Sequence, residues 1–244
     1  MRLAALVVVL LADTSPRDAG KFEIVLDPAK KLKLTFVPIP SVTFQMGADG
    51  TTHRVTFRRS YWIMSTEVTQ AAWQAVMGAN PSQFRGDDKP VDSVSWEDAR
   101  EFIAKLAPKV RGRKLSLPTE AEWECACRAG SATAWCFGDD ESKLGDHAWF
   151  GDSQKEEGSH PVASKKPNRW GLYDMHGNVL EWVEDWMGEY GGDAVDPTGP
   201  ATGQSRVVRG GGWYGVAKLT QSGRRHGYAP TMRGRVVGFR LVAK

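Results

Sequence analysis

The sequence is short of cysteine, of net charge and of long apolar segments. It holds 3 cysteines and a formal net charge of +3 among 244 residues. Because the charge is small and no basic face is concentrated, we do not expect nucleic acid as a partner. No segment is apolar enough to cross a membrane, so no transmembrane segment is predicted. An odd cysteine count leaves at least one thiol free or paired between molecules.

The three cysteines are Cys125, Cys127 and Cys136. Cys125 and Cys127 are two residues apart in a predicted helix and point to different faces, which argues against a shared metal site. A disulfide to Cys136 is one alternative if the protein is exported. Buried structural thiols are the interpretation that we favour.

The N-terminus has one arginine followed by an apolar run over residues 3–12. This run is too short to span a bilayer, but it fits the apolar core of a signal peptide. We therefore predict residues 1–20 to be a signal peptide or N-terminal extension and the protein to be exported, periplasmic or extracellular, and otherwise cytoplasmic. The cleavage site is poor, because Leu10 occupies the −3 position relative to Ala12. An ordinary first strand is the alternative for this segment.

The rest of the composition is that of a soluble globular protein, 41% hydrophobic and 25% charged. The 10 tryptophans and 26 glycines indicate a loop-rich fold held by aromatic clusters. No linker rich in Pro, Gly or Ser and no internal repeat divides the chain, so residues 21–244 are predicted to form one domain.

Short strands are predicted within residues 21–64 from alternating apolar runs that end at Gly or Pro. Thr69, Ser95 and Thr119 are predicted N-caps of three helices, the last two in capping boxes with Asp98 and Glu122. Regular structure fades over residues 130–200, and residues 236–242 are predicted to be a strand buried in a sheet. This order predicts a single α+β domain with few helices.

Residues 206–244 are the segment that we expect to carry function. Three adjacent glycines, beginning at Gly210, allow positive φ and the close approach of another chain segment. An irregular run follows, and loops of such length in compact domains are usually either functional or disordered. Trp213, Tyr214 and Tyr228 argue against disorder. The run is therefore predicted to be a positioned surface.

Six motifs in order resemble one family, that of the formylglycine-generating enzymes or sulfatase-modifying factors. The motifs are Glu67-Val68-Thr69-Gln70; Asn80-Pro81-Ser82; Pro90-Val91 with Ser95-Trp96; Leu117-Pro118-Thr119-Glu120-Ala121-Glu122-Trp123; Gly171-Leu172-Tyr173-Asp174-Met175-His176-Gly177-Asn178; and Arg209-Gly210-Gly211 with Gly238-Phe239-Arg240. The resemblance covers about residues 34 to 243. It implies an irregular variant of the C-type lectin fold.

The resemblance also implies where copper chemistry would lie. Catalytic members hold copper with two cysteines, two and seven residues after the aromatic residue of the Arg-Gly-Gly motif. Counting from Trp213, these positions are Gly215 and Thr220, and neither supplies the thiolate that Cu(I) prefers. We therefore expect no copper and no catalytic residues. Oxidation through a displaced thiol such as Cys136 is the enzymatic alternative.

A calcium site is better matched by the resemblance. The family binds Ca²⁺ with a side-chain oxygen, two carbonyls and a carboxylate, which here implies Asp174, the carbonyls of Gly177 and Val179, and Glu181. Carboxylates with backbone oxygens suit this hard cation. In the alternative, Asp174 caps the turn and Glu181 pairs with an arginine.

The favoured function is a non-catalytic binding module, which we expect to act as a monomer. Family relatives include variable proteins diversified by retroelements, whose side chains vary between the Gly-Gly-x-Trp and Gly-Phe-Arg motifs. Tyrosine in such loops gives a large contact area at low entropic cost. The ligand would be a protein, a peptide or a glycan. The candidate binding residues are Tyr214, Gly215, Val216, Leu219, His226, Gly227, Tyr228, Met232, Gly234, Arg235 and Val236.

Two further alternatives concern histidines and arginines. No histidine has the spacing of a catalytic set, and an iron or copper site made by His160, His176 and His226 stays open. The arginines of the closing segment suggest either an anionic ligand or structural pairs with acids such as Glu181, Glu184 and Asp185. We favour the structural interpretation. These arginines are Arg206, Arg209, Arg224, Arg225, Arg233 and Arg240.

Overall fold

The computed structural model describes the chain except for residues 1–8, 12–19, 49, 111 and 152–157. Most of the predicted signal segment therefore lies outside the described residues. Val9–Leu11 forms strand β1 and pairs antiparallel with β2, which is the alternative that the sequence left open there. Within the described residues, no helix has the length and apolar character that a membrane crossing requires.

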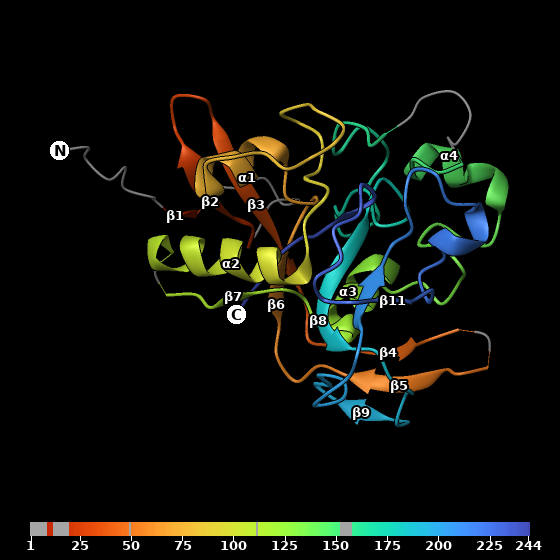
Figure 1. Cartoon of the computed structure of the whole chain (residues 1–244). Helices are drawn as coiled ribbons and strands as arrows, with labels where there is room; N and C mark the ends of the chain where they lie inside the picture. The colour runs from red at the N-terminus through yellow and green to blue at the C-terminus, as the bar shows by residue number, and fades with distance from the viewer. Residues whose placement is uncertain (1–8, 12–19, 49, 111, 152–157) are drawn as a thin grey trace.

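The described residues form three sheets and four α-helices, as the α+β prediction requires (Figure 1). The six-stranded sheet has the order β1-β2-β3-β6-β13-β7, with β2 at Phe22–Asp27, β3 at Leu32–Ile39, β6 at Tyr61–Met64, β13 at Val242–Ala243 and β7 at Leu115–Ser116. The four-stranded sheet has the order β11-β10-β8-β12, with β11 at His226–Tyr228, β10 at Arg206–Arg209, β8 at Leu180–Trp186 and β12 at Val237–Gly238. The three-stranded sheet has the order β4-β5-β9, with β4 at Thr43–Met46, β5 at His53–Thr56 and β9 at Ala194–Val195.

The helices begin where the capping residues predicted them. Thr69 caps α1 (Gln70–Met77), while Ser95 and Thr119 form capping boxes at α2 (Trp96–Leu106) and α3 (Glu120–Arg128). In each box the hydroxyl accepts from the third helical N–H and an acidic side chain accepts from the cap N–H, so two otherwise unpaired donors are satisfied. The remaining helical segments are η1 (Ala107–Lys109), η2 (Glu141–Lys143), α4 (Leu144–His147) and η3 (Ala217–Thr220).

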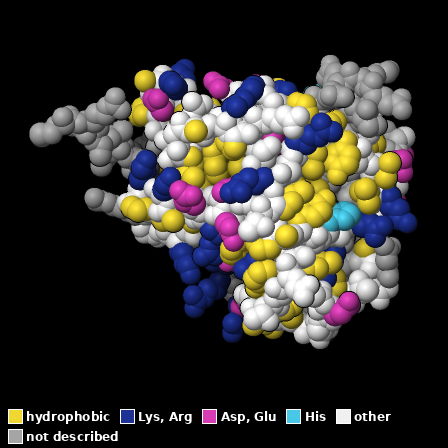
Figure 2. Space-filling model, in the orientation of Figure 1, with side chains coloured by type: hydrophobic (Ala, Val, Ile, Leu, Met, Phe, Trp, Pro, Cys, Tyr) yellow, Lys and Arg dark blue, Asp and Glu magenta, His cyan; other side chains and the backbone are white. Residues whose placement is uncertain are grey.

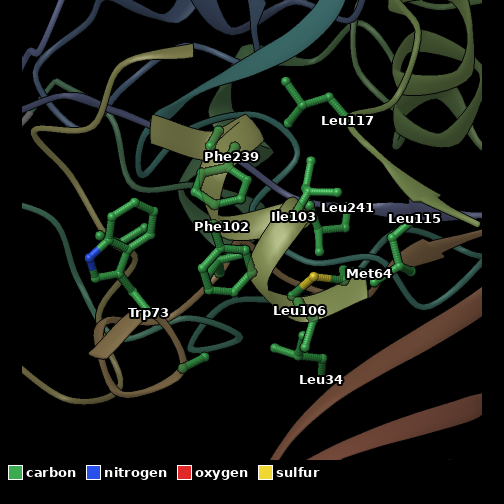
Figure 3. Packing of buried hydrophobic residues seen from close by; sticks show 14 of the residues in the cluster. Leu34, Met64, Trp73, Phe102, Ile103, Leu106, Leu115, Leu117, Phe239 and Leu241 are labelled. Atoms are coloured by element: carbon green, nitrogen blue, oxygen red, sulfur yellow. The ribbon is translucent and has the colours of Figure 1, made fainter. Parts of the chain in front are cut away.

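The larger hydrophobic core lies between α1, α2 and the end of the chain (Figure 3). Trp73 of α1 stacks on Phe102 of α2 with ring centroids 5.5 Å apart, and Phe239 meets Phe102 edge-on, also at 5.5 Å. A second core surrounds Trp123 of α3. Because aromatic pairs add specific contacts to the burial of apolar area, these clusters hold a fold that has few long elements.

The predicted closing strand is two short strands in different sheets. β12 pairs parallel with β8 in the four-stranded sheet, whereas β13 pairs antiparallel with β6 and β7 in the six-stranded sheet. Between them Phe239 enters the core and Arg240 makes a buried ion pair, so a single continuous strand over residues 236–242 is wrong. The chain end thereby connects both sheets.

Arg209, at the end of β10, fixes the start of the C-terminal segment to α3. It is fully buried and donates to the carboxylate of Glu124, with Glu120 3.8 Å away. Its guanidinium also donates to the carbonyl oxygens of Ser222, at 3.0 Å, and of Arg224. Burial alone would lower the pKa of Arg209, but the charges of Glu124 and Glu120 raise it above its usual value. One side chain therefore joins helix, strand and loop.

Arg240 fixes the end of the same segment to β8. Both oxygens of Glu181 accept from Arg240 at 2.7 Å, and neither side chain is exposed. Arg240 also donates to the carbonyl oxygens of Tyr173 and Met64, at 2.9 and 3.2 Å. The predicted pairing of a C-terminal arginine with Glu181 is thus confirmed. A buried charge that is paired and fully hydrogen-bonded fixes geometry, because either partner alone would be very costly to bury.

The other arginines use partners that the sequence did not indicate. Arg225 pairs with Glu120 at 2.6 Å, and the guanidinium of Arg206 lies between Trp96 and Trp186, 3.8 and 3.5 Å from their ring centres. Arg100 of α2, outside the closing segment, pairs with Glu184, while Asp185 has no ion pair among the described residues. Arg206 of the closing segment contacts Glu184 through the backbone carbonyl, at 2.6 Å. The side-chain ion pairs predicted for Glu184 and Asp185 with arginines of the closing segment are not formed within the described residues.

We expect Arg240→Ala to lower the free energy of unfolding by about 3–5 kcal/mol, because it leaves the buried carboxylate of Glu181 without its cation. Arg209→Ala should also lower it, because the carbonyl oxygens of Ser222 and Arg224 lose their donor, although Arg128 stays paired with Glu124 at 2.8 Å. Urea unfolding followed by circular dichroism measures this. Arg233→Ala is the matched control: Arg233 pairs with Asp98 at 2.7 Å but is 56% exposed, so the expected loss is about 0–1 kcal/mol. Equal unfolding midpoints for the Arg240 and Arg233 variants would contradict the structural role.

Candidate functional site

The candidate site is the surface made by residues 214–236 between the two arginine anchors, which we name the C-terminal loop surface. Tyr214 and Val216 are 42% and 63% exposed, and they are two of the four large hydrophobic residues that are exposed in the described part of the chain. Gly227 and Arg235 are also exposed. In Figure 2 hydrophobic side chains gather on the face that carries these C-terminal segments in Figure 1.

A rigid aromatic base lies under Tyr214. Trp213 is buried and meets Phe84 edge-on, with ring centroids 5.5 Å apart, and the Tyr214 ring lies 5.6 Å from the Trp213 ring. The guanidinium of Arg235 lies 5.8 Å from the Trp213 ring centre and 5.9 Å from that of Phe84. Phe84 follows Asn80-Pro81-Ser82 in an irregular segment, so no periodic signal marked it as part of the site.

Several predicted binding residues are partly structural. Tyr228 meets Trp182 edge-on at 6.3 Å, and Met232 and Val236 pack against the larger core. Burial first, and then the neighbouring Tyr214, raises the pKa of Tyr228, so the two tyrosines lie close together. The half-buried residues of the prediction are Leu219, His226, Tyr228, Met232, Gly234 and Val236.

Gly215 is the one predicted exposed position that is buried. Its N–H donates to the carbonyl of Gly212 at 2.9 Å, and its own carbonyl accepts from Gly151 at 2.8 Å. The turn at Gly212 thus folds Gly215 beneath Tyr214 and Val216. Gly211 has φ +80°, and a Cβ there would lie 2.9 Å from the Thr220 side chain, so the glycine permits the close approach that the sequence predicted.

His176 is held beneath the C-terminal loop surface by two backbone contacts. Its Nδ1 lies 2.9 Å from the carbonyl oxygen of Thr220, and its Nε2 accepts from the N–H of Cys136 at 3.1 Å. Both ring nitrogens are therefore used structurally, with the proton on Nδ1. His160 instead stacks on Trp149 at 3.7 Å, and no group of three or more metal-binding side chains occurs within the described residues.

The thiols near this point are free and two of them are deeply buried. Cys125, Cys127 and Cys136 form no disulfide, as the structural-thiol interpretation expected. Burial raises the pKa of Cys125 and of Cys127 to about 12. Because the thiolate is the nucleophile and the metal ligand, these two cysteines are poor candidates for chemistry at neutral pH.

The residues of the predicted calcium site lie in one buried turn. Asp174 has φ +61°, its Oδ2 accepts from the N–H of Ala163 at 2.8 Å, and its Oδ1 is buried without a partner. The carboxyl group of the fully buried Glu67 faces that of Asp174, and no other group donates to either Glu67 oxygen within the described residues. Burial first, and then the charge of Asp174, raises the pKa of Glu67; burial also raises that of Asp174 to about 6. Oxygens left unpaired in this way fit a bound cation.

Glu181 fits the predicted site less well. Besides its two bonds with Arg240, Glu181 accepts from the indole N–H of Trp123 at 2.9 Å. Gly177 and Val179 are buried in the turn between Asp174 and Glu181. The donor set thus fits calcium at Asp174, with Glu67 as an acid that the sequence did not single out, while Glu181 already serves Arg240.

Known proteins share this architecture. A family model described as "Sulfatase-modifying factor enzyme 1-like domain" matches residues 23–244. Among solved structures, variable protein 1 of Treponema denticola is similar with a TM-score of 0.81 and 34% identity, covering 86% of this chain and 95% of that one. PvdO of Pseudomonas aeruginosa is similar with a TM-score of 0.77 and 29% identity, covering 86% and 94%.

Catalytic relatives are similar over a smaller share of their length. The formylglycine-generating enzyme of Streptomyces coelicolor is 38% identical over 167 residues, which are 63% of this chain and 50% of that enzyme. The chain thus spans about half the length of the formylglycine-generating enzymes that it matches. With the matched domain model, the solved relatives and the α+β fold taken together, the chain belongs to the family of sulfatase-modifying factor enzyme 1-like domains, with its C-type-lectin-like fold.

Proposed function

We propose that this chain is a non-catalytic binding module whose C-terminal loop surface binds a protein, peptide or glycan. The observation that carries the proposal is that Tyr214 and Val216 are exposed in a segment whose two ends are fixed by buried arginines. Binding to a preordered surface loses less conformational entropy than binding to a mobile one. A tyrosine that stands on Trp213 is a suitable contact residue, since its ring is already positioned.

The similarity to variable protein 1 supports the same function. The similarity extends over 86% of this chain and 95% of that protein. We further propose that this chain is itself a variable protein diversified by a retroelement. A template repeat of the region encoding residues 214–236 in the neighbouring DNA would support this proposal, and the absence of such a repeat would contradict it.

Export is likewise a proposal, which rests on the apolar run of residues 3–12.

An enzyme of the formylglycine-generating type is the second candidate. Cys127 Sγ lies 3.8 Å from both ring nitrogens of His176, and the Cys136 N–H contacts the same ring. This arrangement places the Cys127 thiol against the same ring that contacts the carbonyl of Thr220, one of the two positions at which copper-binding cysteines are expected. However, Cys127 is fully buried, and the backbone of Cys136 rather than its thiol meets the histidine.

We expect Tyr214→Ser to weaken ligand binding tenfold or more, about 1.4 kcal/mol, because aromatic contact residues dominate such interfaces. A displayed peptide library and a glycan array are each probed with the wild-type protein, and the affinities of the hits are measured by biolayer interferometry. Val195→Ser is the matched control, since Val195 is 55% exposed on β9, outside the C-terminal loop surface. If the ligands keep their affinity for Tyr214→Ser but lose it for Val195→Ser, the binding site lies outside the C-terminal loop surface.

We expect the wild-type protein to show neither tight Cu(I) binding nor oxygen uptake with a sulfatase-motif cysteine peptide. Cu(I) binding is measured against a competing chelator. The double variant Gly215→Cys with Thr220→Cys is the positive control: Gly215 has no positive φ, and its Cβ would lie 3.4 Å from the nearest atom, so a side chain fits there. Restored Cu(I) binding would support the proposed loss of the cysteine pair. Tight copper binding with turnover in the wild type would replace the binding-module proposal.

We also propose that Ca²⁺ binds at Asp174 and stabilises the turn before β8. The melting temperature is expected to rise by several degrees in millimolar Ca²⁺ relative to EGTA, because a ligand that binds only the folded state stabilises it. Asp174→Ala should abolish this difference, and Asp140→Ala, which removes an exposed carboxylate, should keep it. Identical melting of the wild type in Ca²⁺ and in EGTA would rule out a calcium site.

A further inference from the structure

A second concave site lies away from most of the C-terminal loop surface, which contributes only Arg225 to it. It is a cleft of about 420 Å³ between the three-stranded sheet, the first turn of α3 and the loop after β8. These elements lie together in the lower part of Figure 1. Its volume is in the range of small-molecule sites. Met46, Ala121 and Pro197 give it an apolar component.

One wall of the cleft is a stack built around Tyr190. The His53 ring lies 4.5 Å from the Tyr190 ring, and the Arg225 guanidinium lies 4.3 Å from the same ring centre. The Tyr190 hydroxyl donates to Glu120 at 3.2 Å, and Arg225 donates to the other oxygen of Glu120 at 2.6 Å. The negative charge of Glu120 is therefore balanced within the wall itself.

Asp185 is the carboxylate of the cleft whose charge is not balanced. It is 4% exposed and lines the cavity. Its Oδ2 accepts from the backbone N–H of Glu120 at 2.8 Å, whereas Oδ1 has neither a hydrogen bond nor an ion pair within the described residues. A Cβ on Gly199 would lie 2.7 Å from Oδ1, so only a glycine allows the 197–200 segment to pack this close to the carboxylate. A buried carboxylate without a cation is costly, and a ligand that supplies one would remove the cost.

The charges around the cleft determine whether a cationic or an anionic ligand fits. Arg225 is the only lysine or arginine among the described lining residues, and it already serves Glu120. Glu189 adds a further acid to the lining, and Asp193 pairs with Arg54 at 2.7 Å on the rim. The lining is therefore left with acids in excess of cations.

We propose that this cleft binds a small organic cation, an amine or a guanidinium, with Asp185 Oδ1 as its counter-ion and the Tyr190 stack as its wall. The site is independent of the C-terminal loop surface, so either can be right without the other. The Asp185 side chain also accepts a hydrogen bond at the start of α3, and an asparagine can keep that contact while removing the charge.

Ligand binding is expected to depend on pH through Asp185. Burial first, and then the charges of Glu120, Glu122 and Glu184, raises the pKa of Asp185 to about 7. A cation binds the ionised form, so affinity is full above this pKa and falls as the pH drops through it. For a pKa near 7, the dissociation constant should rise about tenfold between pH 8 and pH 6. The charged and titratable groups packed around Asp185 are Glu120 and Glu122 of α3, Glu184 of β8, Glu189, Tyr190, His53, Arg225 and Arg206 of β10.

The test compares n-butylguanidinium with n-butylurea, which has nearly the same shape and no charge. Binding to the full chain at pH 8 is followed by protein-observed NMR titration. We expect the guanidinium to shift the resonances of residues lining the cleft, and the urea to bind at least tenfold more weakly. Asp185→Asn should weaken guanidinium binding tenfold or more. Asp193→Asn, which removes an exposed rim carboxylate, should change it less than threefold.

Equal affinity for the charged and neutral compounds would overturn the proposal, as would unchanged binding in Asp185→Asn. If that variant does not fold, the wild-type comparison at pH 8 and pH 6 decides, since a cleft that recognises shape alone shows no loss of guanidinium binding at pH 6. Shifts confined to residues 214–236 other than Arg225 would likewise overturn it. That result would leave the C-terminal loop surface as the binding site.

Discussion

The rest of the structure depends on charge that is buried and paired. Arg209 with Glu124 and Arg240 with Glu181 are fully removed from water, and each guanidinium also donates to backbone carbonyls from segments distant in sequence. Hydrophobic contacts tolerate small sliding movements, whereas a guanidinium bound by two or more fixed acceptors allows one arrangement. The irregular loops between these anchors therefore keep a shape without regular secondary structure of their own.

This arrangement separates the residues that hold the surface from those that we propose to contact a partner. Trp213, Phe84 and the arginine anchors lie beneath the loops, and Tyr214 and Val216 stand above them. Substitution of an exposed side chain leaves the buried network intact, so the surface chemistry can change while the fold stays the same. In the proposed cation cleft these roles are not separated, because its lining residues Glu120 and Arg225 belong to the same buried ion-pair network as Arg209.

Local signals in the sequence were sufficient for α1, α2 and α3, whereas the short α4, whose cap Lys143 makes no side-chain hydrogen bond, was not predicted. Ser95 with Asp98 and Thr119 with Glu122 form hydrogen bonds within a single helical turn. Their spacing in the sequence is therefore enough to predict the contact in the fold. The closing strand was mispredicted because an apolar run does not indicate which sheet receives it. The shift from β8 to β6 occurs at Arg240, whose partner Glu181 precedes it by 59 residues.

The candidate site was predictable as a region but not residue by residue. The motifs around Trp213 and Gly238 marked its limits, while the burial of Gly215 depends on a turn at Gly212 that one sequence does not specify. Phe84 and Glu67 were missed because both act across long sequence separations from segments without periodicity. The cation cleft is assembled from five separate segments, and no spacing in the sequence brings Asp185 to Gly199.

The division of the chain end between two sheets also has a consequence for the time course of folding. β13 pairs with Ile63 of β6 and Ser116 of β7, and β12 pairs with Leu180 of β8. Contacts of such long separation form slowly, because a large loop must close before any of them is gained. The loops between β10 and β12 can take their final form only after this last closure. The C-terminal loop surface is thus expected to be the last part of the molecule to mature, after the helices and the first sheet have already formed.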